Sequence, residues 1–105
     1  MDLQRGNEML IPNSFRLGRK KYKVELHANS IAKYGTFLPE AKRVIIFNAV
    51  RGKPVDAADK TETFWHEVTH AILHDMDHPR WKDEGFVTAF SKRLTQVVHT
   101  AELEA

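Results

Sequence analysis

The stretch TFWHEVTHAILHDM, residues 63–76, decides the fold prediction. Apolar residues recur in it at intervals of one, three and four, the spacing of one side of a helix. That side and its flank comprise Phe64, Val68, Ala71, Ile72, Trp65 and Met76. The polar residues between them leave the other side of the helix free for chemistry.

The boundaries of this helix follow from the residues around it. Asp56 or Asp59 can cap its start through a side-chain oxygen. Pro79 disfavours helix at the residue before it, so the sequence Asp77-His78-Pro79 ends the helix. We therefore expect a helix from about residue 57 to residue 76.

A second helix is expected after a short turn. Asp83 can cap it, and the following apolar residues recur at spacings of three and four, which is typical of an amphipathic helix. These residues are Val87, Phe90, Leu94 and Val97.

The first half of the chain predicts strands. In residues 15–27, Tyr22, Val24 and Leu26 alternate with polar residues, the period of a half-buried strand. Residues 34–38 and the β-branched run 43–47 form a second extended pair, and their short connection favours antiparallel pairing.

Strands followed by helices indicate an α+β fold. We expect one domain over residues 1–105, in which a small antiparallel sheet of about three N-terminal strands packs on two C-terminal helices. This length suits one compact domain.

The metal-binding prediction rests on the pattern H-E-x-x-H at His66, Glu67 and His70. Residues four apart on a helix share a face, so two imidazoles at this spacing can converge on one zinc ion. Glu67 projects beside the metal, where a carboxylate can accept a proton from the water that zinc activates. The alternative is a polar surface helix without a metal.

Catalytic zinc normally takes three protein ligands, and Glu84 is our choice for the third. A helical hairpin with a short turn would bring the first turn of the second helix back to the metal. Asp83 is a rival, although it suits the cap better. His78 is another rival, because a turn could fold it back to make a His-only site. His74 shares the face of His70 but lies about 12 Å from the first histidine along a straight helix.

A peptidase also needs a donor for the oxyanion that forms on the scissile carbonyl. Tyr34, His74 and His99 are the candidates, and the sequence does not choose among them. The open edge of the predicted sheet offers a second functional feature, since an extended peptide could add to it as a further strand.

The composition of the chain excludes some kinds of metal site and indicates where the protein is located. The chain has no cysteine, which excludes disulfides and thiolate metal sites and fits a reducing compartment. No apolar run approaches the roughly 18 residues that span a bilayer, and the N-terminus lacks the apolar core of a signal peptide. We therefore expect a cytoplasmic protein without membrane contact.

Charge is distributed unevenly along the chain. Residues 1–50 carry nine Lys and Arg against four Asp and Glu, whereas residues 51–105 carry seven against ten. The basic part centres on Arg16, Arg19, Lys20, Lys21 and Lys23. Such a cluster is either a footprint for nucleic acid or, more commonly, the solvated face of a strand and its turn. We favour the solvated face, which leaves nucleic acid as the less favoured partner.

Two segments carry a resemblance to a known group of proteins. TFWHEVTHAILHDM and the later DEGFVTAFSKRL resemble small bacteriophage and prophage metallopeptidase-like proteins, which are minimal zincins of the gluzincin type. The resemblance is specific over residues 61–98 and loose over the N-terminal strands. The chain is also similar, more distantly, to the metallopeptidase domain of phage-repressor-cleaving and stress-response regulators.

This resemblance implies zinc on His66, His70 and Glu84, with Glu67 as the general base and a sheet packed on the two helices. One departure concerns Thr88, which stands four residues after the third ligand, where the larger gluzincins often have an aspartate. Such outer partners orient metal ligands by hydrogen bonding to them. Here a residue other than the one at position 88 would have to orient the Glu84 carboxylate.

The resulting functional hypothesis is a zinc-dependent metallopeptidase that hydrolyses a peptide or protein substrate, with Glu67 moving the proton. Two alternatives remain: a zincin-like binding module that uses zinc for stability, and a DNA-associated or repressor-cleaving regulatory protease guided by the basic half.

Overall fold

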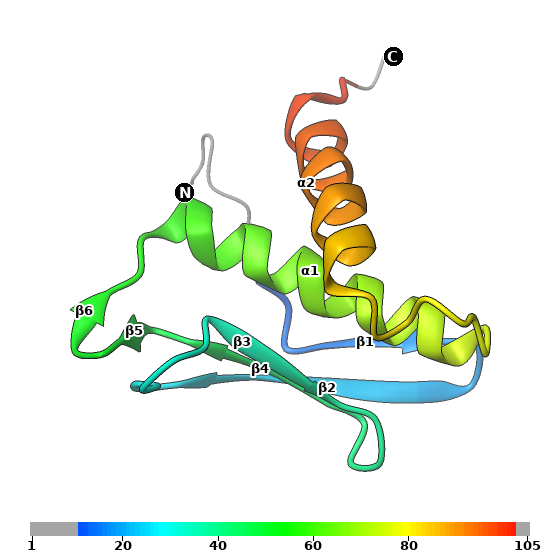
Figure 1. The fold of residues 1–105 in the computed structure, drawn as a ribbon, viewed down its shortest axis with the longest axis horizontal. Coiled ribbons are helices and arrows are strands. Elements are labelled where there is room, and N and C mark those ends of the chain that lie inside the picture. The colour runs from blue at the N-terminus through cyan, green and yellow to red at the C-terminus, as the bar shows by residue number, and fades with distance from the viewer. Residues whose placement is uncertain (1–10, 103–105) are drawn as a thin grey trace.

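A computed structural model describes residues 11–102 of the chain. It has six strands followed by two helices (Figure 1), as the sequence predicts for an α+β fold. The strands are β1 (Ser14–Leu17), β2 (Lys20–His27), β3 (Gly35–Leu38), β4 (Arg43–Phe47), β5 (Ala49–Val50) and β6 (Lys53–Pro54). The helices are α1 (Ala57–Asp75) and α2 (Glu84–Thr100).

The main sheet has four strands in the order β1-β2-β4-β3, and it is mostly antiparallel. We expected about three antiparallel strands, and the difference lies in the central pair, because β2 and β4 are parallel. A parallel pair needs a long crossover, and β3 with its flanking segments, residues 28–42, provides it. The expected antiparallel pairing of β3 with β4 is confirmed.

Two tight turns build the hairpins of this sheet. Gly18 has a φ of 62° between β1 and β2, a backbone conformation that glycine adopts without strain. Lys42 has a φ of 52° at the turn from β3 into β4. The segment of residues 48–55 folds into the small antiparallel hairpin of β5 and β6.

The core lies between the sheet and α1. Val44 and Ile46 of the central strand meet Phe64 and Val68 of the helix, and all four are buried. These residues confirm the expected inner side of the helix. Met76, expected on its flank, is the cap residue after the last turn and is 61% exposed.

Both helices begin at the expected aspartates. The Asp56 carboxylate accepts a hydrogen bond from the Asp59 N–H at 2.8 Å and caps α1. The Asp83 carboxylate accepts one from the Phe86 N–H at 3.0 Å and caps α2. These bonds satisfy backbone donors that a helix start leaves free.

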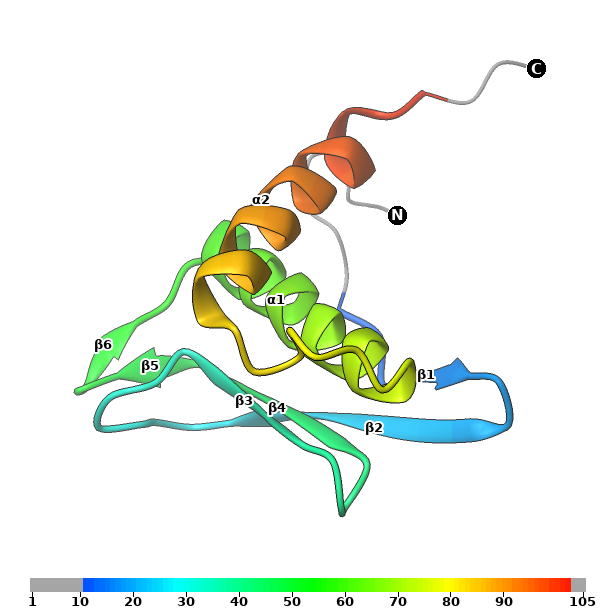
Figure 2. The same ribbon diagram turned by 45° about the vertical axis from the view of Figure 1, so that its right-hand side comes forward.

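The two helices relate differently to the sheet. α1 lies along one face of the sheet, whereas α2 packs on the other side of α1 and ends well clear of the strands (Figures 1 and 2). Among residues 11–102, no helix is long and apolar enough to cross a membrane.

Candidate metal centre

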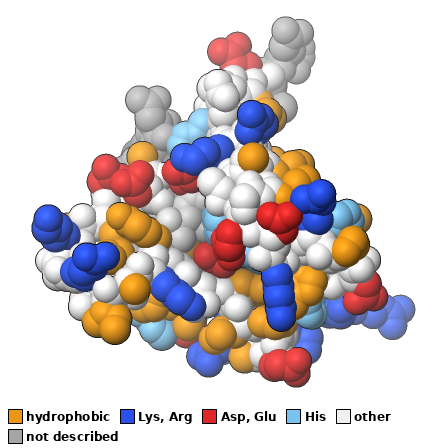
Figure 3. All heavy atoms as spheres, viewed as in Figure 1, with side chains coloured by type: hydrophobic (Ala, Val, Ile, Leu, Met, Phe, Trp, Pro, Cys, Tyr) orange, Lys and Arg blue, Asp and Glu red, His pale blue; other side chains and the backbone are white. Residues whose placement is uncertain are grey.

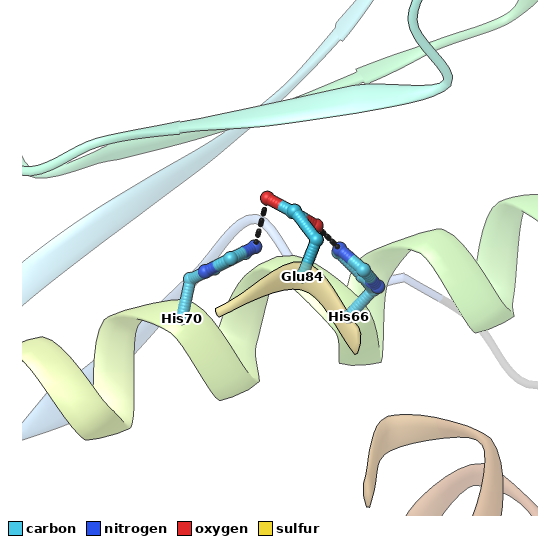
Figure 4. A group of neighbouring side chains, drawn as sticks. All are labelled: His66, His70 and Glu84. Carbon is cyan, nitrogen blue, oxygen red and sulfur yellow. Dashed lines mark hydrogen bonds and ion pairs between the residues drawn. The ribbon is translucent and has the colours of Figure 1, made fainter. Parts of the chain in front are cut away.

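Three predicted ligands come together in the structure. His66 and His70 project from the middle of α1, and Glu84, the first residue of α2, reaches between their rings (Figure 4). One donor atom from each residue can be chosen so that all three lie within 4.8 Å of one another. In the described part of the chain, this is the group of His, Asp and Glu side chains able to hold a metal ion.

The separations between donor atoms suit a tetrahedral cation. Glu84 Oε1 lies 3.0 Å from His66 Nε2, and Glu84 Oε2 lies 3.2 Å from His70 Nε2. Bonds of 2.0–2.1 Å at tetrahedral angles would place neighbouring ligand atoms about 3.3 Å apart. The residues present therefore fit a small divalent cation with two imidazoles and one carboxylate.

The turn between the helices prepares the His70 ring for this role. His70 Nδ1 lies 2.6 Å from the backbone oxygen of Trp81, and only a protonated Nδ1 can donate to a carbonyl. The proton on Nδ1 leaves a lone pair on Nε2, the nitrogen that faces Glu84. A bond of this kind fixes both the tautomer and the orientation of a metal ligand.

Glu67 is a buried carboxyl group next to the three donors. Its pKa is raised to about 8, mainly by burial and in smaller part by the negative charge of Glu84, whereas the Lys33 ammonium acts in the opposite direction. A cation held at the donor cluster would neutralise the charge of Glu84 and remove the second cause. Desolvation and charge at this position are typical of functional carboxyl groups.

Gly35 allows the edge strand to approach this carboxyl group closely. A Cβ atom at Gly35 would lie 2.6 Å from Thr63 Cγ2, 2.9 Å from the Ile45 oxygen and 3.3 Å from Glu67 Cγ. The first two separations are shorter than a Cβ atom tolerates, so any other residue at this position would force the strand and the helix apart. The close approach brings the edge of the sheet over the part of α1 that carries the donors.

The donors and Glu67 open into one cleft of about 780 Å³. Its walls are β3 with the residue pair before it, the polar face of α1, and the first half of α2 with the turn that precedes it. Acidic and basic side chains are interspersed over this side of the molecule (Figure 3). The edge strand and both helices therefore line the cleft, as the sequence predicts for the site.

The rival ligands are engaged elsewhere. Asp83 caps α2 and pairs with Arg80 at 2.7 Å; its pKa is lowered mainly by the hydrogen bond from the Phe86 N–H. The His78 ring stacks on Phe86 and accepts the Arg80 N–H through Nδ1. Neither Asp83 nor His78 belongs to the donor cluster.

The three candidates for an oxyanion donor differ in whether they line the cleft. Tyr34 lines the cleft and is 53% exposed. The His74 ring packs edge-on against Phe37 and Trp81, and it does not line the cleft. His99 lies in the last turn of α2, also outside the cleft lining.

Comparison with known proteins finds no match. No protein-family model, curated protein or solved structure matches this chain. The chemistry of the site is therefore argued from its own residues.

Three features of the site went unnoticed in the sequence. The backbone carbonyl of Trp81 orients a predicted ligand. Gly35 carried a usable signal, because a glycine at the start of a strand often marks a close approach of backbone to another element. Lys33, whose charge acts on Glu67, carried no signal that distinguishes it from other surface lysines.

Proposed function

We propose that this chain is a zinc-dependent metallopeptidase, with His66, His70 and Glu84 as zinc ligands and Glu67 as the general base. One observation carries the proposal: the three donors converge within 4.8 Å beside a buried carboxyl group in an open cleft. Two imidazoles with one carboxylate form a ligand set typical of catalytic zinc. The cysteine-free sequence is compatible with a reducing cytoplasm.

The openness of the cluster favours a catalytic role over a structural one. The side chain of Glu84 is 70% exposed and that of His66 is 22% exposed. Structural zinc sites are closed by four protein ligands, whereas catalytic sites keep one position open. Bound zinc would supply Lewis-acid chemistry, which polarises a carbonyl group and makes water acidic at neutral pH.

Two residues of the chain would carry out the proton transfer and stabilise the oxyanion. Glu67 takes up the proton of the attacking water on its carboxylate and delivers it to the departing amine nitrogen as the C–N bond breaks. The products are a carboxyl group and an amine, so one water is consumed for each bond cut. Tyr34 is the candidate in the cleft lining for donating a hydrogen bond to the developing oxyanion.

The edge strand offers a docking site for an extended substrate. The Phe47 N–H donates to the Tyr34 oxygen at 2.9 Å, which makes these two residues a hydrogen-bonded pair between β4 and β3. Along an antiparallel ladder, residues whose N–H and C=O groups point to the neighbouring strand alternate with residues whose groups point away from it. The N–H and C=O groups of Gly35 and Phe37 therefore point to the free edge of β3. A peptide can add to this edge as a fifth strand, directly above the donor cluster.

The ends of the cleft differ in character, which suggests substrate selectivity. Phe37 and Trp81 form an apolar wall at one end, with ring centroids 6.3 Å apart. Lys33, Asp59 and Glu62 line the other end and make it polar. We infer that the preferred peptide carries a large apolar side chain on one side of the scissile bond and polar side chains on the other.

The decisive experiment replaces the base and leaves the ligands intact. The Glu67→Gln protein should bind about one zinc per chain but cleave a library of internally quenched peptides at least about 100-fold more slowly than the original. Glu40→Gln is the matched control, because it makes the same change at an exposed glutamate outside the cleft lining and the donor cluster. Its rate should stay within about threefold of the original. Undiminished cleavage by Glu67→Gln would refute the mechanism.

A further inference from the structure

The face of the sheet opposite α1 is a separate surface with its own chemistry. Side chains alternate along a strand, and Tyr22, Val24, Val44 and Ile46 point towards the helix side. The intervening residues therefore point the other way and form what we call the outer face. It consists of Ser14, Arg16, Lys21, Lys23, Glu25, His27, Arg43, Ile45 and Phe47, with Thr36 and Leu38 of β3.

Cations stand side by side on the outer face. Arg16 lies opposite Lys21 across the β1–β2 pair. Lys23 lies beside Arg43 across the β2–β4 pair. Like charges directly opposite one another destabilise a sheet, so this arrangement costs the free protein some stability. With a polyanion bound, the same cations would stabilise the complex instead of destabilising the sheet.

Little within the described residues neutralises this charge. Glu25 is the acidic member of the outer face, and it pairs with Arg43 at 3.2 Å and with His27 at 2.9 Å. Arg16, Lys21 and Lys23 have no ion pair within residues 11–102. Both helices lie on the opposite side of the sheet, so neither covers these side chains (Figures 1 and 2).

The same face carries aromatic rings at the end away from the cations. His27 and Phe47 are register partners in β2 and β4, four residues beyond the Lys23–Arg43 pair. Their ring centroids are 6.0 Å apart with nearly perpendicular planes, and His27 is exposed. The arrangement places a charged region and a ring region along two adjacent strands.

We propose that the outer face binds single-stranded nucleic acid, with phosphates at Arg16, Lys21, Lys23 and Arg43 and a base against His27 and Phe47. A cationic surface beside aromatic rings is the usual design for binding single strands. A broad four-stranded sheet suits a single strand better than a duplex, because the major groove admits only a helix or a two-stranded ribbon. The sequence alone favoured a solvated strand face; the gathering of these cations on one face that neither helix covers favours a ligand.

This proposal is independent of the peptidase activity, because none of the cations and rings assigned to nucleic acid lines the cleft, which shares only Thr36 with the outer face. It predicts binding by the full chain with or without zinc. Nucleic acid on one face would hold the protein near its binding site, while the other face stays open to a peptide.

The test is fluorescence anisotropy with a labelled 20-nucleotide oligothymidylate at several salt concentrations. Four phosphate contacts predict a slope of log affinity against log salt of about −3, so affinity should fall about 50-fold between 50 and 200 mM salt. The double variant Lys21→Gln with Lys23→Gln should bind more weakly and reduce the slope by about 1.4. His27→Ala should lower affinity without changing the slope.

A matched control changes the same amount of charge elsewhere. Lys53→Gln with Arg93→Gln removes two exposed cations from β6 and α2, outside the outer face. Its affinity should stay within about twofold of the original. Equal weakening in both double variants would overturn the proposed site. Equal competition by polyglutamate of the same length, or tighter binding of a duplex, would overturn single-stranded nucleic acid as the ligand.

Discussion

The two helices contribute to the same donor cluster but are anchored very differently. α1 buries eight residues between the sheet and α2, whereas α2 buries only Val87 and Ser91. α1 therefore supplies two donors from a rigid support. α2 supplies the third from a helix that is fixed mainly at its start, where Glu84 stands next to the capping residue Asp83.

This difference suggests a way for a small chain to bring three donors together on two helices. One ligand-bearing helix is held by the core, and the other is held by the turn before it and by the ligand itself. A metal bound to all three residues would tie the weakly anchored helix to the strongly anchored one, because binding free energy then adds to folding free energy.

The largest expected effect contrasts two phenylalanines. Phe64 of α1 is 4% exposed and Phe90 of α2 is 49% exposed. Phe64→Ala should lower the free energy of unfolding by about 3–5 kcal/mol, because it leaves a cavity in the core. Phe90→Ala should cost about 1 kcal/mol or less. Urea unfolding followed by circular dichroism measures both, and similar losses would show that the helices are equally anchored.

Zinc should stabilise the two helices unequally. At free zinc about 1,000-fold above its dissociation constant, the free energy of unfolding should rise by about 4 kcal/mol. Hydrogen exchange should slow more in the first turns of α2 than in α1, since the latter is already protected by the core. Addition of a chelator should reverse the change. In Glu84→Ala the selective protection of α2 should vanish, and equal slowing in both helices would contradict the tie between them.

The two capping aspartates provide a finer comparison. Asp83→Ala removes the cap one residue before Glu84, so the carboxylate ligand loses its fixed starting point and zinc affinity should fall about tenfold. Asp56→Ala removes the corresponding cap of α1, ten residues before His66. It should lower thermal stability but leave zinc affinity within about twofold. Competition with a chromophoric chelator measures both affinities, and equal losses would argue against a special role for the start of α2.

The smallest effect concerns the ion pair between the helices. Lys92 Nζ lies 3.4 Å from Glu62 Oε2, and the two side chains are 60% and 38% exposed. A double-mutant cycle with alanine at each position should give a coupling of about 0.5 kcal/mol or less. A coupling several times larger would mean that α2 is anchored along its length rather than at its start.

Much of this arrangement could be predicted from local sequence signals. The helix starts follow from Asp56 and Asp83, because a side-chain cap acts over three residues. The strand pairing of β3 with β4 follows from the short turn between them. The gathering of His66, His70 and Glu84 follows from one helical spacing and one short interhelical turn.

The remaining features depend on contacts between distant segments. The parallel pairing of β2 with β4 could not be predicted, because alternation in each strand is the same for either direction. The packing of His74 against Phe37 depends on where the edge strand lies over α1. The bond from His70 to the Trp81 carbonyl involves a backbone group, which no side-chain pattern reveals.

The sheet consists of two local hairpins that meet along a single parallel seam. Each hairpin closes a short loop, whereas the seam joins residues twenty apart, such as Lys23 and Arg43. Contacts between distant residues form late, because closing a long loop costs more entropy. Val44 on one side of the seam packs with Phe64 and Val68 of α1, and Val24 on the other side packs against this cluster. We therefore expect the helix that carries the two histidines to dock as the seam closes, so that a newly made chain acquires its metal-binding geometry only at the end of folding.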